Sequence, residues 1–197
     1  YSLNNNNYEL IINSLGAELK SVKYKNEEYL HIGDDVYWDE SSPILFPIVG
    51  RLKEGRYLYN NKEYKLPIHG LAKANEFKII EQTDSKLTFL LKENEEFLKH
   101  YPFAFNLKIT YILNENDFKI QYEVVNLNDY TMYFAIGAHP SFLLKADIND
   151  TFMEFECKEN LDRLCLGLQS GCIESKTPNY LTSNILQLQK QIFKDDS

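Results

Sequence analysis

The segment Phe105–Val125 reads FNLKITYILNENDFKIQYEVV and holds the clearest structural pattern in this sequence. Apolar and polar residues alternate along 105–113 and again along 117–125, so each arm has one apolar and one polar face. A period of two is that of a β-strand, because successive side chains point to opposite faces of the sheet. The link Asn114-Glu115-Asn116 is rich in turn-forming residues. The segment therefore predicts an antiparallel hairpin with one face in the core and the other in water.

The same pattern recurs on both sides of this hairpin. Asn60-Asn61 lies between two short alternating runs, and because Asn tolerates a positive φ it predicts a tight two-residue turn. The further strands expected from alternation are 8–13, 17–24, 56–59, 62–66, 76–82, 86–92 and 131–136. Helical signals are weak: Glu93–His100 could form a turn or two, and 161–168 and 183–191 are ambiguous. Many short strands separated by turns predict an all-β sandwich or barrel.

Composition bounds the size and the partners of the protein. The length of 197 residues predicts a single domain spanning 1–197. Fourteen Tyr and twelve Phe favour strands, since aromatic rings pack well on a pleated surface. A net charge of −8 argues against a nucleic-acid partner, because phosphate backbones repel an acidic chain. The densest basic stretch, Arg51, Lys53 and Arg56, is suited to one small anion instead.

The cysteines and the lack of long apolar runs indicate in which cellular compartment the protein is expected. Cys157, Cys165 and Cys172 are odd in number and match no zinc-binding spacing, so we interpret them as reduced thiols of a cytoplasmic protein. The four histidines are scattered and specify no metal site. The polar, Asn-rich start has no signal-peptide core, and no apolar run approaches the roughly 20 residues of a membrane helix. No membrane partner is expected.

Three stretches with Gly or Pro interrupt the alternation and hold the candidate functional residues: 38–51, 66–72 and 136–142. In the last of them, Gly137 and Pro140 frame His139 in a stiff loop. An imidazole exchanges a proton near neutral pH, which suits acid–base catalysis. The residues support a catalytic His139 and a His139 that only satisfies a buried backbone group about equally.

The other candidates have simple structural interpretations as well. His69, before Gly70, could be a turn residue, and Trp38 could be a core residue or a platform on which a sugar stacks. Arg51 ends an apolar run, where it either pairs with a carboxylate or faces a pocket and binds hydroxyls or an anion. Asp196, beside Asp195, reads as part of a solvated charge pair.

Taken together, these stretches resemble the aldose 1-epimerase family, the galactose mutarotases, and within it the LacX-type branch. Five stretches match in the family's order: Gly16–Ser21, Trp38–Arg51, His69–Ala72, Tyr101–Phe105 and Gly137–Phe142. The resemblance implies an all-β fold, a large antiparallel β-sandwich of the galactose mutarotase-like supersandwich type, with a sugar cleft on one sheet. It also implies interconversion of the α and β anomers of an aldose, with no metal or organic cofactor.

The resemblance assigns roles to individual residues. His139 matches the family's general acid at the sugar ring oxygen, and His69 matches the histidine that binds and polarises the sugar. Arg51 matches an arginine that contacts sugar hydroxyls, and Asp196 matches an aspartate that binds another hydroxyl. Trp38 stays a candidate sugar-binding platform beside them.

One part of the family pattern lies outside this sequence. The family's general base is a glutamate in strands beyond the position of Ser197, so we expect a C-terminally incomplete sandwich with open strand edges. An acid–base partner contributes about 10²–10⁴-fold to the rate. Residues 1–197 alone are therefore expected to be nearly inactive.

Three functions stay open at this point. The first is an isomerase acting on a free hexose, and the second is a hexose-6-phosphate 1-epimerase, which the cations Arg51, Lys53 and Arg56 motivate because guanidinium groups bind phosphate bidentately. The third is a carbohydrate-binding or sensing protein without catalysis, motivated by the missing base. In each case the partner is a small-molecule sugar. The oligomeric state stays open, with a homodimer as one option.

Overall fold

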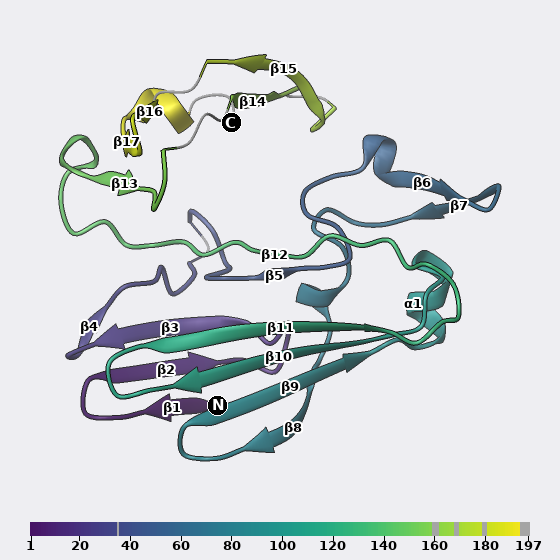
Figure 1. Cartoon of the computed structure of the whole chain (residues 1–197), viewed down its shortest axis with the longest axis horizontal. Helices are drawn as coiled ribbons and strands as arrows, with labels where there is room; N and C mark the ends of the chain where they lie inside the picture. The colour runs from purple at the N-terminus through teal and green to yellow at the C-terminus, as the bar shows by residue number, and fades with distance from the viewer. Residues whose placement is uncertain (35, 159–161, 168–169, 179–180, 194–197) are drawn as a thin grey trace. The chain divides into compact units, whose positions relative to one another are not determined.

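The computed structural model describes residues 1–34, 36–158, 162–167, 170–178 and 181–193, which fall into two compact units (Figure 1). The first unit comprises residues 1–51 and 55–143, and the second comprises 52–54 and 144–197. The single domain expected over 1–197 stays a prediction. No helix in the described part of the chain is long and apolar enough to cross a membrane.

The first unit contains two four-stranded antiparallel sheets. The N-terminal sheet has the order β1-β2-β3-β4, and the second sheet has the order β11-β10-β9-β8. The strands of the first sheet are β1 (Ser2–Asn4), β2 (Tyr8–Ile12), β3 (Leu19–Tyr24) and β4 (Glu27–Glu28). Those of the second are β8 (Lys78–Gln82), β9 (Lys86–Lys92), β10 (Phe105–Leu113) and β11 (Phe118–Asn126).

Shorter elements of the first unit connect and flank these sheets. Two pairs of strands stand apart, β5 with β12 and β6 with β7. Their bounds, with those of the helical segments, are β5 (Ile44–Leu45), η1 (Lys53–Gly55), β6 (Arg56–Tyr59), β7 (Lys62–Lys65), η2 (Ala72–Ala74), α1 (Glu95–His100) and β12 (Gly137–Ala138). Of η1, only Gly55 belongs to this unit.

The two four-stranded sheets pack face to face around an apolar core. Leu10 and Ile12 of β2 are fully buried, as are Phe89 of β9 and Ile109 of β10. The hydroxyl of the buried Tyr111 donates a hydrogen bond to the Ala17 carbonyl at 2.7 Å, which joins β10 to the segment before β3. The predicted all-β antiparallel sandwich is therefore confirmed.

The hairpins expected from the alternation are present. β10 and β11 pair in continuous antiparallel register from Phe105↔Asn126 to Leu113↔Phe118. Alternate residues of β10 are buried, as the period of two predicts. In the β6–β7 hairpin, Asn60 and Asn61 have φ of 48° and 60°, the positive values that a tight turn requires.

The prediction of a strand at Thr131–Ile136 is wrong. These residues form no ladder, and the next strand, β12, begins only at Gly137. A strand needs a neighbour that offers a row of partners. Here single hydrogen bonds hold the chain instead: Ala135 N–H donates to Pro47 O at 2.9 Å, and the Tyr101 hydroxyl donates to Tyr133 O at 2.8 Å.

The helical expectation at 93–100 is confirmed by α1. Its N-terminus is capped by the Asn94 side chain, which accepts a hydrogen bond from Phe97 N–H at 2.9 Å. Such a cap satisfies one of the amides that lack a partner within the helix. Phe97 is the buried residue that ties the helix to the core.

The second unit is built from short antiparallel strands. A three-stranded sheet has the order β13-β17-β16, and β14 pairs with β15. The elements are η3 (Ile148–Asp150), β13 (Phe152–Glu154), β14 (Arg163–Leu166), β15 (Ile173–Thr177), β16 (Leu181–Thr182), β17 (Ile185–Gln187) and η4 (Lys190–Phe193). The ambiguous segments 161–168 and 183–191 thus contain strands β14 and β17.

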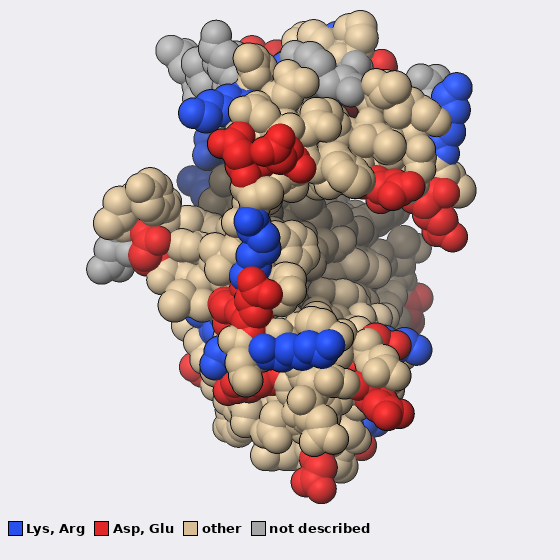
Figure 2. Space-filling model, turned by 90° about the vertical axis from the view of Figure 1, so that its left-hand side faces the viewer, with Lys and Arg blue, Asp and Glu red and all other residues tan. Residues whose placement is uncertain are grey.

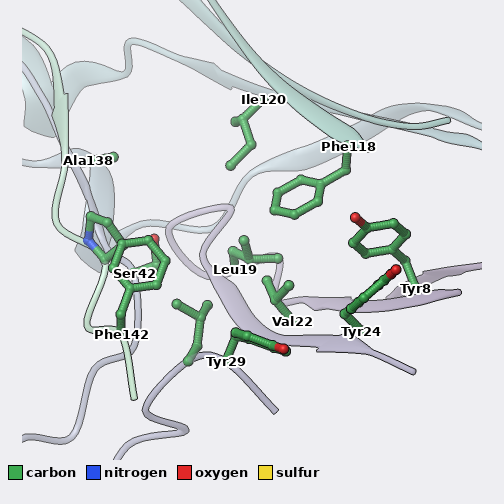
Figure 3. A pocket seen from close by; sticks show the side chains of 12 residues that line it. Tyr8, Leu19, Val22, Tyr24, Tyr29, Ser42, Phe118, Ile120, Ala138 and Phe142 are labelled. Carbon is green, nitrogen blue, oxygen red and sulfur yellow. The ribbon is translucent and has the colours of Figure 1, made fainter. Parts of the chain in front are cut away.

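An apolar cleft of about 420 Å³ lies in the first unit, beside strands β3 and β11 (Figure 3). Phe118 and Ile120 of β11 line it from one side, and Leu19 and Val22 of β3 line it from another. Tyr122, on the same face of β11, is 38% exposed, whereas its partner Ile109 on β10 is 0% exposed. The inner face of edge strand β11 is thus less covered than that of β10.

Candidate active site

Strands β5 and β12 place His139 at the end of a short ladder. Gly137 pairs with Leu45, Ala138 pairs with Ile44, and the backbone N–H of His139 donates to Pro43 O at 3.1 Å. This ladder holds the backbone while the side chain of His139 stays exposed. An exposed imidazole on a held backbone can reach a bound small molecule and exchange a proton with it.

His69 is held in a left-handed conformation, with φ of 65°, by three hydrogen bonds. Its N–H donates to Gly50 O at 2.7 Å, its carbonyl accepts from Phe46 N–H at 3.2 Å, and its Nδ1 accepts from Gly50 N–H at 3.2 Å. Because Nδ1 accepts a hydrogen bond, the neutral ring carries its proton on Nε2. His69 is therefore set up to donate a hydrogen bond from Nε2 to an oxygen atom.

The two candidate histidines and Trp38 form a row of rings. The centroids of His69 and His139 are 5.6 Å apart, and those of His139 and Trp38 are 5.1 Å apart. The backbone of Trp38 is anchored, since its carbonyl accepts from His31 Nε2 and from Asp34 N–H, both at 2.8 Å. Three residues from separate loops are thus brought together.

Burial and nearby positive charge lower the pKa of His69. The largest cause is burial of the imidazole, followed by His139, Lys73 and Arg51, while Glu40 acts in the opposite direction. All these influences bear on the same half-buried ring, and their sum favours neutral His69 at neutral pH. Protonation of Nδ1 would also break its hydrogen bond from Gly50 N–H.

We expect the His69 ring to titrate below the ordinary histidine value of about 6.5. Since the folded pKa is lower than the unfolded one, the neutral ring contributes stability that is complete above about pH 6.5 and is lost as the pH falls through the folded pKa. NMR titration of the imidazole signals, with His69→Gln to assign them, measures this value. A His69 pKa at or above 6.5 would contradict the burial and charge described for it.

The other predicted site residues differ in how far the structure places them. Arg51 is exposed, and its positive charge helps to lower the pKa of His69. Asp196 lies outside the described residues. Lys53 belongs to the second unit, whereas Arg51 and Arg56 belong to the first. Among the described residues, no three or more His, Cys, Asp or Glu side chains gather to hold a metal ion.

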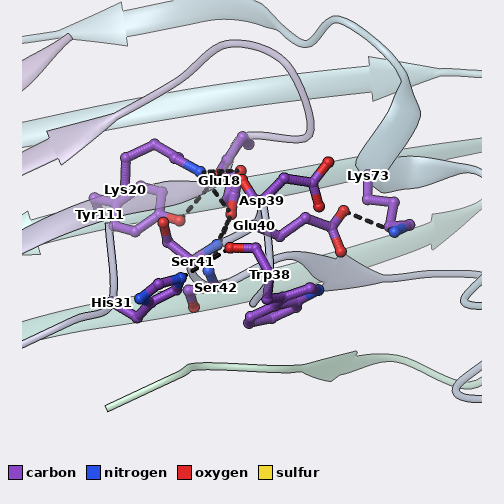
Figure 4. A network of polar contacts seen from close by, with 11 residues as sticks. Glu18, Lys20, His31, Trp38, Asp39, Glu40, Ser41, Ser42, Lys73 and Tyr111 are labelled. Atoms are coloured by element: carbon purple, nitrogen blue, oxygen red, sulfur yellow. Dashed lines mark hydrogen bonds and ion pairs between the residues drawn. The ribbon is translucent and has the colours of Figure 1, made fainter. Parts of the chain in front are cut away.

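Two charged residues that sequence reasoning missed lie near His69. Glu40 Oε1 and Lys73 Nζ form an ion pair at 2.7 Å, with side chains 23% and 25% exposed (Figure 4). Both residues act electrostatically on His69. The sequence did place both residues next to candidate site residues: Glu40 is two residues after Trp38, and Lys73 follows the stretch His69–Ala72.

Glu18 anchors the loop that carries Trp38 and Glu40. Its Oε1 accepts the backbone N–H groups of Ser41 at 2.6 Å and Ser42 at 3.0 Å (Figure 4). The side chain of Glu18 is only 14% exposed, and Lys20 Nζ lies 3.4 Å from its Oε2. One carboxylate thereby satisfies two amides of a loop that has no ladder of its own.

We expect Glu18→Ala to destabilise the protein by about 1–3 kcal/mol, because two buried amides lose their acceptor. Urea denaturation measures the change. The matched control is Glu9→Ala, which removes an exposed carboxylate paired with Lys23 at 3.0 Å and should cost about 0–1 kcal/mol. Equal losses in the two variants would show that the loop does not depend on Glu18.

The apolar cleft beside β11 is a poor candidate for the sugar site. It borders the His139 loop through Ala138 and Pro140, but its lining is apolar apart from tyrosine hydroxyls and Ser42. A sugar presents many hydroxyl groups, and a hydroxyl buried without a hydrogen-bond partner costs free energy. The row of rings around His139 stays the better candidate.

The charged side chains of the surface are a separate matter. On the face shown in Figure 2, acidic and basic side chains are intermixed.

A model of the aldose 1-epimerase family matches residues 1–191. The chain belongs to the aldose 1-epimerase family. The plasmid-encoded protein LacX of Lactococcus lactis subsp. lactis is 32% identical to it, in an alignment that covers 93% of this chain and 66% of LacX. The chain thus spans slightly less than two thirds of the length of that relative. The predicted resemblance to the family and its LacX-type branch is confirmed.

Solved structures of similar proteins share this aldose 1-epimerase family fold. A galactose mutarotase related enzyme from Lactobacillus acidophilus is 36% identical, with a TM-score of 0.85 over 100% of this chain and 67% of that one. A galactose mutarotase-like protein from Lactobacillus casei is 32% identical, with a TM-score of 0.88 over 98% of this chain and 68% of that one. The predicted galactose mutarotase-like fold is confirmed.

Proposed function

We propose that the protein interconverts the α and β anomers of an aldose sugar, with His139 and His69 as its catalytic histidines. Membership of the aldose 1-epimerase family supports this reaction class. The observation that carries the proposal is the pairing of the two rings at 5.6 Å, although the residues are 70 positions apart in sequence. A hexose is the substrate that we propose.

The reaction requires an acid at one oxygen and a base at another. A base takes the proton of the C1 hydroxyl while an acid protonates the ring oxygen, so the bond between C1 and the ring oxygen breaks. Rotation about the C1–C2 bond and the reverse proton transfers close the ring on the other face. A group that works in both directions needs a pKa near the working pH.

The two histidines suit different parts of this reaction. His139 is exposed and is the proposed acid at the ring oxygen, because its ring lies beside those of His69 and Trp38 while its backbone is held. His69 is favoured in its neutral form, with the proton on Nε2, and we propose that it donates a hydrogen bond to a sugar oxygen. By the family resemblance, a glutamate acts as the base in this reaction.

Trp38 and Arg51 are the proposed binding residues. The indole of Trp38 packs against His139 at 5.1 Å and offers an apolar surface to the C–H groups of a sugar. Arg51 supplies exposed hydrogen-bond donors, and its charge acts on His69. Asp196 stays a proposed hydroxyl ligand on the strength of the resemblance alone.

Activity on a hexose 6-phosphate is the less favoured alternative. Of the three cations that motivate it, Arg56 already forms an ion pair: its Nη1 is 2.9 Å from Glu63 Oε2. An exposed pair of this kind is weak, so a phosphate could still compete for Arg56. A rate on the phosphorylated sugar well above that on the free sugar would favour this alternative.

Polarimetry on freshly dissolved α-D-galactose and α-D-glucose tests the proposal, using the natural protein that contains residues 1–197. We expect the optical rotation to relax faster than in buffer. Relaxation at the buffer rate with both sugars and with a hexose 6-phosphate would overturn it. Calorimetric binding of sugar without any acceleration would point to a carbohydrate-binding or sensing protein instead.

A further inference from the structure

The Glu40–Lys73 ion pair connects two segments that carry site residues. Glu40 lies two residues after Trp38, in the loop whose amides Glu18 binds. Lys73 lies in η2, four residues after His69. The bond between Glu40 Oε1 and Lys73 Nζ, at 2.7 Å, therefore links the Trp38 side of the site to the His69 side (Figure 4).

The segment around Lys73 is otherwise tied to the chain near His69. Phe46 O accepts the N–H groups of Leu71 at 2.7 Å and Ala72 at 3.1 Å, while Phe46 N–H donates to His69 O. The start of η2 is thus hydrogen-bonded to Phe46, the same residue that bonds to His69. The backbone at the start of η2 and the backbone of His69 therefore share Phe46 as a hydrogen-bond partner.

The two charges act on His69 with opposite sign. Lys73 lowers the pKa of the imidazole, and Glu40 raises it. The other charged or titratable groups that act on the ring are His139 and Arg51, which both lower the pKa. Both members of the pair are only about a quarter exposed, so solvent screens them less than it screens exposed pairs.

We propose that Glu40 and Lys73 are positioning residues for His69: their ion pair fixes the spacing of the Trp38 and His69 segments and balances opposite charges beside the imidazole. The catalytic meaning of this inference rests on the proposed function, but the electrostatic arrangement does not. Neither residue is assigned a contact with the sugar. The pair acts through His69.

Two single substitutions should move the His69 titration in opposite directions. Lys73→Gln removes a positive charge and should raise the pKa of His69, whereas Glu40→Gln removes a negative charge and should lower it further. The double variant should lie between them. NMR titration of the imidazole measures all three. Lys86→Gln, which breaks an exposed ion pair with Glu81 at 2.8 Å, is the matched control and should leave His69 unchanged.

Shifts in the same direction, or no shift, would overturn the proposal, because removing a positive and a negative charge that both act on the ring must shift its pKa in opposite directions. Trp38 is the single tryptophan of the chain, so its fluorescence reports whether the loop has moved. Lys73→Arg keeps the charge and should restore both the wild-type titration and the fluorescence. These readouts need no catalytic activity, so they can fail or succeed independently of the proposed function.

If the protein proves active, the same variants give a second measurement. A misplaced catalytic group can cost up to about 100-fold in rate. We expect Lys73→Gln to lower kcat more than it changes KM and to move the acid limb of the pH–rate profile, with Lys73→Arg close to wild type. A change in KM alone would mean that Lys73 binds the sugar directly, and would overturn its role as a positioning residue.

Discussion

We expect His139→Ala, which removes the proposed general acid, to lower the rate of anomer interconversion by about 10²–10⁴-fold, the contribution of a typical general acid. The variant should fold normally, because the side chain of His139 is exposed and its backbone hydrogen bond to Pro43 O is kept. Polarimetry with the natural protein that contains residues 1–197 measures the rate. Circular dichroism and thermal unfolding confirm the fold in the same samples.

The matched control for this experiment is His100→Ala. His100 lies on α1, is partly exposed, and its Nδ1 donates a hydrogen bond to Lys65 O at 3.0 Å. No ring contact joins it to His69 or His139 among the described residues. Its removal should leave the rate unchanged. An unchanged rate in His139→Ala as well would remove His139 from the mechanism.

Gly70→Ala destabilises the protein by about 2–5 kcal/mol, the largest effect on stability that we expect. Gly70 has φ of 77°, and this left-handed backbone costs an L-residue about 1–2 kcal/mol. A Cβ at this position would lie 2.4 Å from the carbonyl oxygen of Phe46. Relief of such an overlap with backbone costs about 1–3 kcal/mol more.

Gly50→Ala separates the two causes. Gly50 has a similar φ of 86°, but a Cβ there would meet no atom within 4 Å. Urea denaturation should therefore show a loss of only about 1–2 kcal/mol for Gly50→Ala. Equal losses in the two variants would mean that the close approach of Phe46 O to Gly70 does not constrain the packing.

Local structure followed from local sequence. The alternation in 105–113 and 117–125 predicted β10 and β11, because the side-chain period of a strand is a property of the strand itself. Asn60-Asn61 predicted its turn for the same reason, since a positive φ is a preference of the residue. Thr131–Ile136 shows the limit: its residues suit a strand, but a ladder also needs a neighbouring strand, which the local sequence does not specify.

The site itself was only partly predictable. The Gly and Pro framing singled out His139 and His69, but not that their rings lie 5.6 Å apart, which depends on β12 pairing with β5 and on Gly50 holding His69. The Glu40–Lys73 pair was missed because its members are 33 residues apart and each resembles an ordinary surface charge. Sequence alone thus determined the strands, their turns and the candidate residue types, since these depend on neighbours along the chain. Only the tertiary structure decided which side chains meet, because that depends on how distant segments pack.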